Sequence, residues 1–200
     1  MNLNKNLNEF KIFVRVENKI LIECIDDTTI DIFGGIECED LSLKLSIIEI
    51  MKSQYNIGIH KELLMYLGTD NHEISYYFTI LNSTPNRHSL GLNEFLNSNI
   101  SLITRNFIED NYNKIDFYVN STIDEVIVAN TGSLLRLYRG YRSDLINELP
   151  ENSKKFNKKK NSIILKSSDM LNKLIPWCSK IRTKNFIKDK INKINKFLEI

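Results

Sequence analysis

Short stretches in which apolar side chains alternate with polar ones dominate the first eighty residues, and this alternation predicts β-strands. The first stretch is Phe10–Val16, and a turn at Glu17–Lys19 connects it to a second, Ile20–Ile25, so that the two form a hairpin. A third strand, Ile30–Phe33, leads directly into two glycines. The later strand candidates in this part of the chain are Ile57–His60, Leu63–Gly68 and Glu73–Leu81.

A helical period replaces this alternation between Leu43 and Gln54. Apolar residues occupy so much of the expected helix that we expect it to be largely buried. Glu49 lies among them and has two interpretations. It either belongs to a narrow exposed side together with Lys52 and Ser53, or it points into a site.

The pattern is less regular after residue 82. Leu92–Leu96 predicts a short helix, whereas Ile100–Ile108 and Ile123–Val128 fit a strand or a helix equally well. Ile115–Val119 is rich in β-branched and aromatic residues, so it is the better strand candidate. Nearer the C-terminus, helices are expected at Ser133–Leu149, at Ser162–Ile175 and, beyond a break at Pro176, at Ser179–Ile200.

Residues suited to ligand chemistry cluster after the third strand. Gly34 and Gly35 come first, and the acids Glu37, Glu39, Asp40 and Glu49 follow. Glycine lets a backbone bend and approach a ligand closely, and carboxylate oxygens are the ligands that magnesium prefers. We therefore expect the glycines to contact a ligand and the four acids to be able to hold a metal ion.

The order of these parts resembles the signature of the Nudix family, Gly-x5-Glu-x7-Arg-Glu-hydrophobic-x-Glu-Glu-x-Gly. Counted from Gly34, Asp40 falls on the first acid of the signature and Glu49 on the Glu that follows Arg. The resemblance covers about residues 10–82. It implies an α+β fold with a mixed β-sheet sandwiched by helices, and hydrolysis of nucleoside diphosphate-linked compounds with magnesium or manganese, in which Glu49 would be catalytic.

Several positions depart from that signature. Ile48 replaces the Arg, Lys52 and Ser53 replace the Glu-Glu pair, Tyr55 replaces the last Gly, and Phe33 replaces the proline that usually precedes the glycines. In the family, the Glu-Glu pair supplies most of the metal ligands, so its loss weakens a metal site. The departures favour a Nudix-fold protein that is not an enzyme and binds a nucleotide-type ligand or a partner in a regulatory or scaffold role. The alternative is a divergent hydrolase that holds magnesium or manganese with Glu37, Glu39, Asp40 and Glu49.

Charge is distributed unevenly along the chain. Residues 1–150 hold 13 Lys/Arg and 21 Asp/Glu, whereas residues 151–200 hold 14 and 4. This shift predicts a boundary between 149 and 150, which separates the domain at 1–149, Nudix-like by its resemblance, from a basic helical extension at 150–200 that starts with a flexible linker, Pro150–Asn161. The basic part, residues 154–196, can pack on its own domain or bind RNA, DNA or an acidic protein. A nucleic-acid-associated structural component is therefore a third hypothesis.

Arginines recur every three residues in the expected helix at Ser133–Leu149, at Arg136, Arg139 and Arg142, with tyrosines between them. Guanidinium groups bind phosphate through paired hydrogen bonds, so these arginines are candidate ligand-binding residues. The alternative is that they form the solvated side of an amphipathic helix.

The cysteines and the apolar runs indicate the cellular environment. Cys24, Cys38 and Cys178 are odd in number and far apart, which excludes the usual zinc spacing and favours a reduced, cytoplasmic chain. The N-terminus lacks the apolar core of a signal peptide. No apolar run reaches the roughly 18 residues that span a bilayer.

Overall fold

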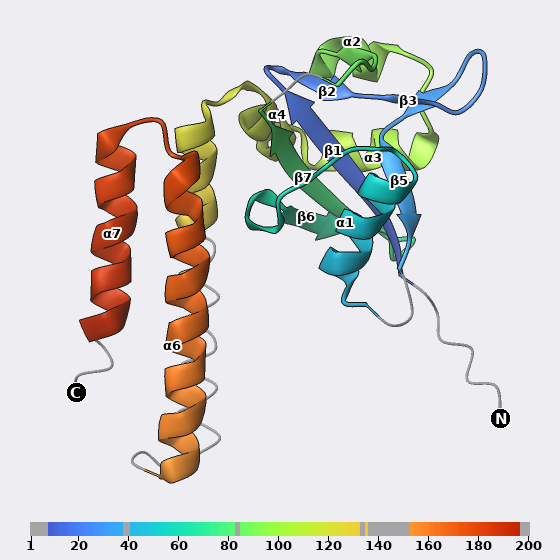
Figure 1. The fold of residues 1–200 in the computed structure, drawn as a ribbon. Coiled ribbons are helices and arrows are strands. Elements are labelled where there is room, and N and C mark those ends of the chain that lie inside the picture. The colour runs from blue at the N-terminus through green and yellow to red at the C-terminus, as the bar shows by residue number, and fades with distance from the viewer. Residues whose placement is uncertain (1–7, 38–40, 83–84, 133–134, 136–152, 197–200) are drawn as a thin grey trace, which may run out of the picture. The chain divides into compact units, whose positions relative to one another are not determined.

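The computed structural model describes residues 8–37, 41–82, 85–132, 135 and 153–196, apart from the side chain of Phe156. These residues belong to two compact units, 1–121 and 122–200 (Figure 1). The charge shift along the sequence predicts a boundary at 149/150, whereas the two compact units divide at 121/122.

A six-stranded mixed sheet forms the centre of the first unit, in the order β6-β7-β1-β2-β8 with β5 also paired to β1. β1 (Glu9–Val16) runs parallel to β7 (Ser75–Leu81) on one side. On its other side, the first half of β1 pairs with β5 (Phe33–Ile36) and its end pairs with β2 (Lys19–Leu21), both antiparallel. The remaining strands are β6 (Met65–Thr69) and β8 (Ser89–Leu90), with β3 (Glu23–Cys24) and β4 (Ile30–Asp31) in a separate pair.

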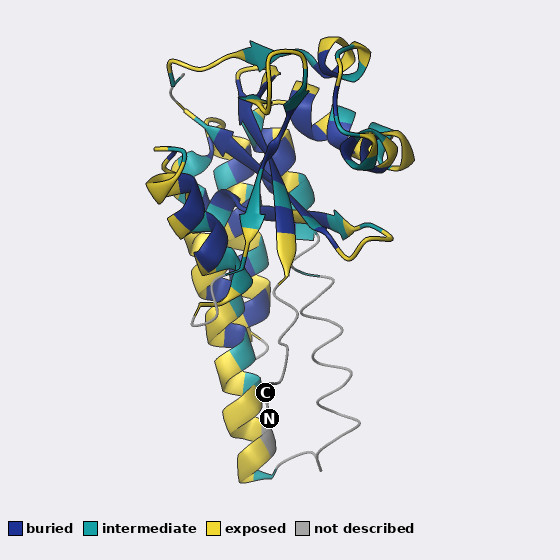
Figure 2. Ribbon diagram, turned by 90° about the vertical axis from the view of Figure 1, so that its right-hand side faces the viewer, coloured by how far each residue is buried: buried dark blue, intermediate teal, exposed yellow. Residues whose placement is uncertain are grey.

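One face of the sheet is covered by α1 (Leu43–Ser53). Alternate residues of β1, among them Phe10 and Ile12, pack with Ile47 and Met51 of this helix in one buried cluster. Figure 2 shows these central strands as buried. The alternation in Phe10–Val16 and the helical period in Leu43–Gln54 are therefore confirmed. Each places its apolar side chains on the side where the sheet and α1 meet.

The opposite face of the sheet packs against α3 (Leu102–Asp110) and α4 (Tyr112–Asn120). The ring of Phe107 stacks on Tyr76 of β7 with 3.6 Å between centroids, and Tyr118 stacks on Phe78 at 5.1 Å. Helices thus lie on both faces of a mixed sheet, which confirms the expected α+β class. Two shorter helices complete the unit, η1 (Lys61–Leu63) and α2 (Leu92–Asn97).

The edge strand β6 is irregular. Its pairing with β7 shifts between Tyr66 and Gly68, so that Leu67 forms a bulge. The ammonium group of Lys114 donates a hydrogen bond to the carbonyl of Leu67. The ammonium group of Lys44 donates to the carbonyl of Leu64, just before the strand, at 3.1 Å.

The second unit is helical in its described residues. Residues 123–132 are helical, α6 (Lys154–Leu174) is a long helix, and α7 (Ile181–Lys196) follows it. The short η2 (Ile175–Trp177) separates α6 from α7 and confirms the break expected at Pro176. A hydrogen bond of 2.8 Å from Ser168 Oγ to Asn195 Oδ1 joins α6 to α7. Among the described helices, none combines the length and the apolar character that a membrane crossing requires.

Asp124 connects the helix at 123–132 to α7. Its carboxylate accepts hydrogen bonds from the backbone N–H groups of Ser179 and Lys180, at 3.1 and 3.0 Å, and from the Ser179 hydroxyl. These donors lie just before α7, where a helix leaves its N–H groups without intrahelical partners. Asp124 therefore caps α7 from another helix.

Three expectations from the sequence are corrected. Ile115–Val119 belongs to helix α4 and not to a strand, because its buried residues Ile115, Tyr118 and Val119 follow a helical spacing. Pro150–Asn161 is not a linker throughout, since α6 already starts at Lys154. Ile57–His60 has no regular structure. The expected helix at Ser133–Leu149 lies almost entirely outside the described residues.

Candidate functional site

The two glycines of the motif lie in strand β5. A Cβ atom on Gly34 would be 3.0 Å from the carbonyl oxygen of Phe10, and one on Gly35 would be 3.1 Å from the Phe10 ring and 3.2 Å from Ile50. Neither glycine has a positive φ. The close approach of β1 and α1 to β5 is thus sufficient to explain both glycines, and their contact with a ligand stays a prediction.

Gly35→Ala should lower the free energy of unfolding by about 1–2 kcal/mol, because the added methyl group has to displace Phe10 or Ile50 in a packed core. Urea unfolding followed by circular dichroism measures the change. Gly58→Ala is the matched control, since a Cβ there meets nothing within 4 Å. Equal stability of the two variants would contradict this account of Gly35.

The acids of the motif are only partly described. Glu37 follows β5 and accepts a hydrogen bond of 2.5 Å from Asn8 Nδ2, and Glu49 is exposed on α1. Glu39 and Asp40 lie outside the described residues, as do Arg136, Arg139 and Arg142. Among the described residues, no three His, Cys, Asp or Glu side chains come together as a metal site.

The residues that follow Glu49 are exposed with it on α1. Lys52 lies one turn further along the helix, and the Ser53 hydroxyl donates a hydrogen bond of 2.7 Å to the carbonyl of Glu49. A lysine one turn from a carboxylate lies on the same side of a helix. An ammonium group beside Glu49 opposes the binding of a cation there.

Two departures from the Nudix signature, Phe33 and Tyr55, contact each other. Their rings meet edge to face with 4.9 Å between centroids, and the Tyr55 hydroxyl donates a hydrogen bond of 3.0 Å to the carbonyl of Gly34. Arg87 lies over the Phe33 ring, 5.5 Å from its centroid, and donates a hydrogen bond of 2.5 Å to the carbonyl of Tyr55. Residues far apart in the sequence therefore meet beside the glycine strand.

Glu23 of β3 completes this cluster, which we call the Glu23–Arg87 cluster and define as Glu23, Phe33, Tyr55 and Arg87. Burial raises the pKa of Glu23, and the opposing effects of a hydrogen bond with Tyr55 and of the Arg87 charge do not cancel that increase. Burial also raises the pKa of Tyr55, and the Glu23 charge adds to the increase. The cluster thus combines a half-buried carboxyl with an exposed guanidinium group.

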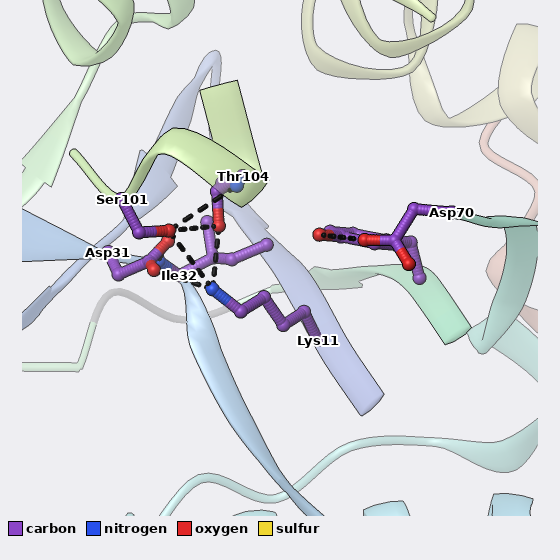
Figure 3. A network of polar contacts seen from close by, with 7 residues as sticks. Lys11, Asp31, Ile32, Asp70, Ser101 and Thr104 are labelled. Atoms are coloured by element: carbon purple, nitrogen blue, oxygen red, sulfur yellow. Dashed lines mark hydrogen bonds and ion pairs between the residues drawn. The ribbon is translucent and has the colours of Figure 1, made fainter. Parts of the chain in front are cut away.

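A second polar cluster lies on the other face of the sheet (Figure 3). Lys11 Nζ is 2.6 Å from Asp31 Oδ2, 2.7 Å from Thr104 Oγ1 and 3.2 Å from Ser101 Oγ. The side chains of Lys11 and Asp31 are only 14% and 6% exposed. Because these groups are buried and bind one another, the cluster ties β1 and β4 to α3 and is not open to a ligand.

A hollow of about 140 Å³ lies near the turn between β6 and β7, lined by residues that include Asp70, His72, Phe107 and Asp110. Asp70 accepts hydrogen bonds from the backbone N–H groups of His72 and Ile74 and from the Tyr76 hydroxyl, at 2.9, 3.0 and 3.1 Å. Both oxygens of Asp70 therefore serve the turn and the adjacent strand. This explains the aspartate without a ligand.

Comparison with family models, with curated proteins and with solved structures found no match. The motif read from the sequence includes Gly34 of β5 and Glu49 of α1, but neither Glu23 nor Arg87. The only sequence signal for the cluster was the pair of departures, Phe33 and Tyr55, which the structure places in contact.

Proposed function

We propose that the first unit binds a nucleotide-type ligand at the Glu23–Arg87 cluster and does not hydrolyse it. The observation that carries this proposal is the half-buried carboxyl of Glu23, held beside Tyr55 and the exposed guanidinium group of Arg87. A carboxyl whose pKa is raised by burial is less stable in its ionised form than it would be in water. Ionisable groups retained under such conditions are typical of functional sites.

The groups of the cluster match the parts of a nucleotide. Arg87 uses one of its five N–H donors on the carbonyl of Tyr55, so its other donors can bind phosphate. Stacking on Phe33 holds the guanidinium plane in position. Glu23 is an acceptor and pairs with hydroxyl or amino donors, which a ribose or a base supplies. The resemblance to the Nudix family supports the same ligand class.

Binding without hydrolysis is supported by the residues around Glu49. Lys52 and Ser53 occupy the positions that carry the family's carboxylate pair, and both are exposed on α1. The Lys52 ammonium group repels a magnesium or manganese ion, and the Ser53 hydroxyl carries no negative charge and donates its hydrogen to the carbonyl of Glu49. On this proposal, Glu49 is a surface residue of α1 and not a catalytic one.

Arg87→Gln should weaken the binding of ADP or ADP-ribose about tenfold, since a charge-assisted bond to phosphate is lost. Glu23→Gln should also weaken binding, yet it should leave the fold as stable as the wild type or more stable, because a partly desolvated charge is removed. Isothermal titration calorimetry measures the affinity, and urea unfolding measures the stability. Lys61→Gln, on η1, is the matched loss of a positive charge outside the cluster.

Two outcomes would overturn the proposal. One is unchanged affinity in both cluster variants. The other is turnover of a nucleoside diphosphate compound with magnesium or manganese that disappears in Glu49→Gln, which would establish the divergent hydrolase instead.

A further inference from the structure

The hollow between α3 and the turn that joins β6 to β7 shares no residue with the Glu23–Arg87 cluster. Its volume is about 140 Å³. The ring of Phe107, which lines it, stacks on Tyr76 with 3.6 Å between centroids and so holds α3 against β7. Asp70 accepts hydrogen bonds from the backbone of the turn. Both walls of the hollow are therefore kept in place by contacts within the first unit.

Apolar and polar side chains occupy different depths of this hollow. Of its apolar lining residues, Phe107 is buried and Ile103 is half-buried. The exposed lining residues are all polar: Thr69, Asn71, His72, Asn106 and Asp110. An organic group that enters would thus meet apolar side chains inside and hydrogen-bonding groups at the opening.

Two carboxylates, those of Asp70 and Asp110, give the hollow a negative charge. The Asp70 oxygens are used by the turn and by Tyr76, whereas Asp110 has no hydrogen bond or ion pair with another residue in the described part of the chain. None of the described residues that line the hollow is a lysine or an arginine. Lys114, which follows closely in sequence, directs its ammonium group to the carbonyl of Leu67 and does not line the hollow. A ligand here therefore meets a carboxylate that no lining cation neutralises.

Two asparagines on the α3 side of the hollow add amide groups. Nδ2 of Asn111 donates a hydrogen bond of 3.0 Å to the carbonyl of Phe107, so its Oδ1 remains as an acceptor. The side chain of Asn106 makes no hydrogen bond within the described residues. Asn106 and Asp110 are four residues apart and share one side of α3. These groups together supply several acceptors to one small space.

We infer that the hollow binds the ammonium end of a small primary amine. An ammonium group has three N–H donors and no acceptor, which matches the Asp110 carboxylate and the amide oxygens of Asn106 and Asn111. Its hydrogen bonds to a carboxylate are charge-assisted and so stronger than those between neutral groups. The carbon chain of the amine then contacts Ile103 and the Phe107 ring.

Other ligands fit this lining less well. A metal ion needs several convergent ligands, and among the described residues no three His, Cys, Asp or Glu side chains come together as a metal site. A phosphate or another anion would be repelled by the two carboxylates. A single water molecule occupies about 30 Å³ in the liquid, which is far less than this hollow. A neutral alcohol has one O–H donor and no charge, so it should bind more weakly than the amine.

The test follows the amide NMR signals of the isotope-labelled full-length chain during titration with n-butylammonium chloride at constant ionic strength. Signals of the β6–β7 turn and of α3 should shift and saturate. The dissociation constant should lie in the millimolar range, because so small a ligand makes few contacts. n-Butanol, which has the same carbon chain and no charge, should bind at least about fivefold more weakly.

Asp110→Asn should weaken the binding of n-butylammonium about fivefold, since a charge-assisted hydrogen bond becomes a neutral one. Glu109→Gln is the matched control. It removes an exposed carboxylate at the neighbouring position of α3, which does not line the hollow, and should retain the wild-type affinity. Asn106→Lys places an ammonium group of the chain itself at the hollow and should abolish binding, while the helix is preserved because lysine favours it.

Spermidine and N-acetyl-lysine amide distinguish two sources of the ammonium group, a free polyamine and the lysine side chain of a partner. Saturable binding of either at the same signals supports the inference, and the tighter of the two identifies the source. Three results would overturn it: the absence of saturable shifts, equal affinity for n-butanol and n-butylammonium, or an equal loss of affinity in Asp110→Asn and Glu109→Gln.

Discussion

Lys11→Met should lower the free energy of unfolding of the first unit by about 3–5 kcal/mol, the range for removing one partner of a buried ion pair. The Lys11 ammonium group lies among Asp31, Ser101 and Thr104, and without it the Asp31 carboxylate is buried with no positive charge in contact. The only other hydrogen bond described for that carboxylate comes from the backbone N–H of Ile32, at 2.8 Å. Hydrogen exchange of β1 peptides during urea unfolding measures the loss within this unit.

Two further variants distinguish the effect of breaking the Lys11–Asp31 ion pair from the effect of replacing a lysine side chain. Lys11→Met/Asp31→Asn should regain at least half of the loss, because a neutral amide still accepts the Ile32 hydrogen bond without a buried charge. Lys44→Met removes a half-buried lysine whose hydrogen bond, among the described residues, goes to a carbonyl, so it should cost about 1 kcal/mol. A loss in Lys44→Met as large as that in Lys11→Met would contradict a special role for the pair.

Asp124→Ala should lower the free energy of unfolding of the second unit by about 3 kcal/mol, because several donors at the start of α7 lose a charged acceptor. Trp177, the only tryptophan of the chain, lies directly before the capped segment, so its fluorescence reports this unit. Urea unfolding followed at Trp177 measures the effect. Asp169→Ala, which removes an exposed carboxylate of α6, is the matched control and should cost less than about 1 kcal/mol.

The Asp124 carboxylate should also make the free energy of unfolding of the second unit depend on pH. Burial by itself raises the pKa of Asp124, but hydrogen bonds from Ser179, Lys180 and Thr183 outweigh it and lower the pKa from 3.8 to about 2. A lowered pKa means that the stabilisation, about 2 kcal/mol, is complete above pH 4 and is lost as the pH falls toward 2. Asp124→Asn should remove this part of the pH dependence of stability, measured by urea unfolding followed at Trp177. An unchanged acid profile in Asp124→Asn would show that other carboxyl groups cause it.

The strands β1 and β7 and the helix α1 could be predicted because each has a long apolar pattern of a single period. Ile115–Val119 could not, since four of its five residues are β-branched or aromatic and favour a strand locally, whereas stacking of Tyr118 on Phe78 fixes a helix. The start of α6 was missed for a related reason. Apart from Phe156, its first turns are lysine and asparagine, which read as a linker, and Ile164 is the first buried residue among the described side chains of this helix.

The candidate site likewise contains residues that the sequence indicated and residues that it did not. Positions close in sequence, from Gly34 to Glu49, could be read as one motif because the strand β5 and the helix α1 lie close together along the chain. Arg87 and Glu23 could not be added, because their meeting with Tyr55 depends on how β3 and the loop before β8 lie against β5. Sequence spacing gives no information about such long-range contacts. In the sequence, Phe33 and Tyr55 stood out only as departures from the Nudix signature.

The irregular edge at β6 has a consequence for self-association. An unpaired strand edge offers N–H and C=O groups to the strand of another molecule, and sheets that extend in this way form aggregates. At β6 a bulge at Leu67 interrupts the regular spacing, and Lys114 and Lys44 bind the carbonyls of Leu67 and Leu64. A second chain would have to displace two ammonium groups and match an irregular strand. This edge is therefore a poor template for intermolecular β-sheet growth.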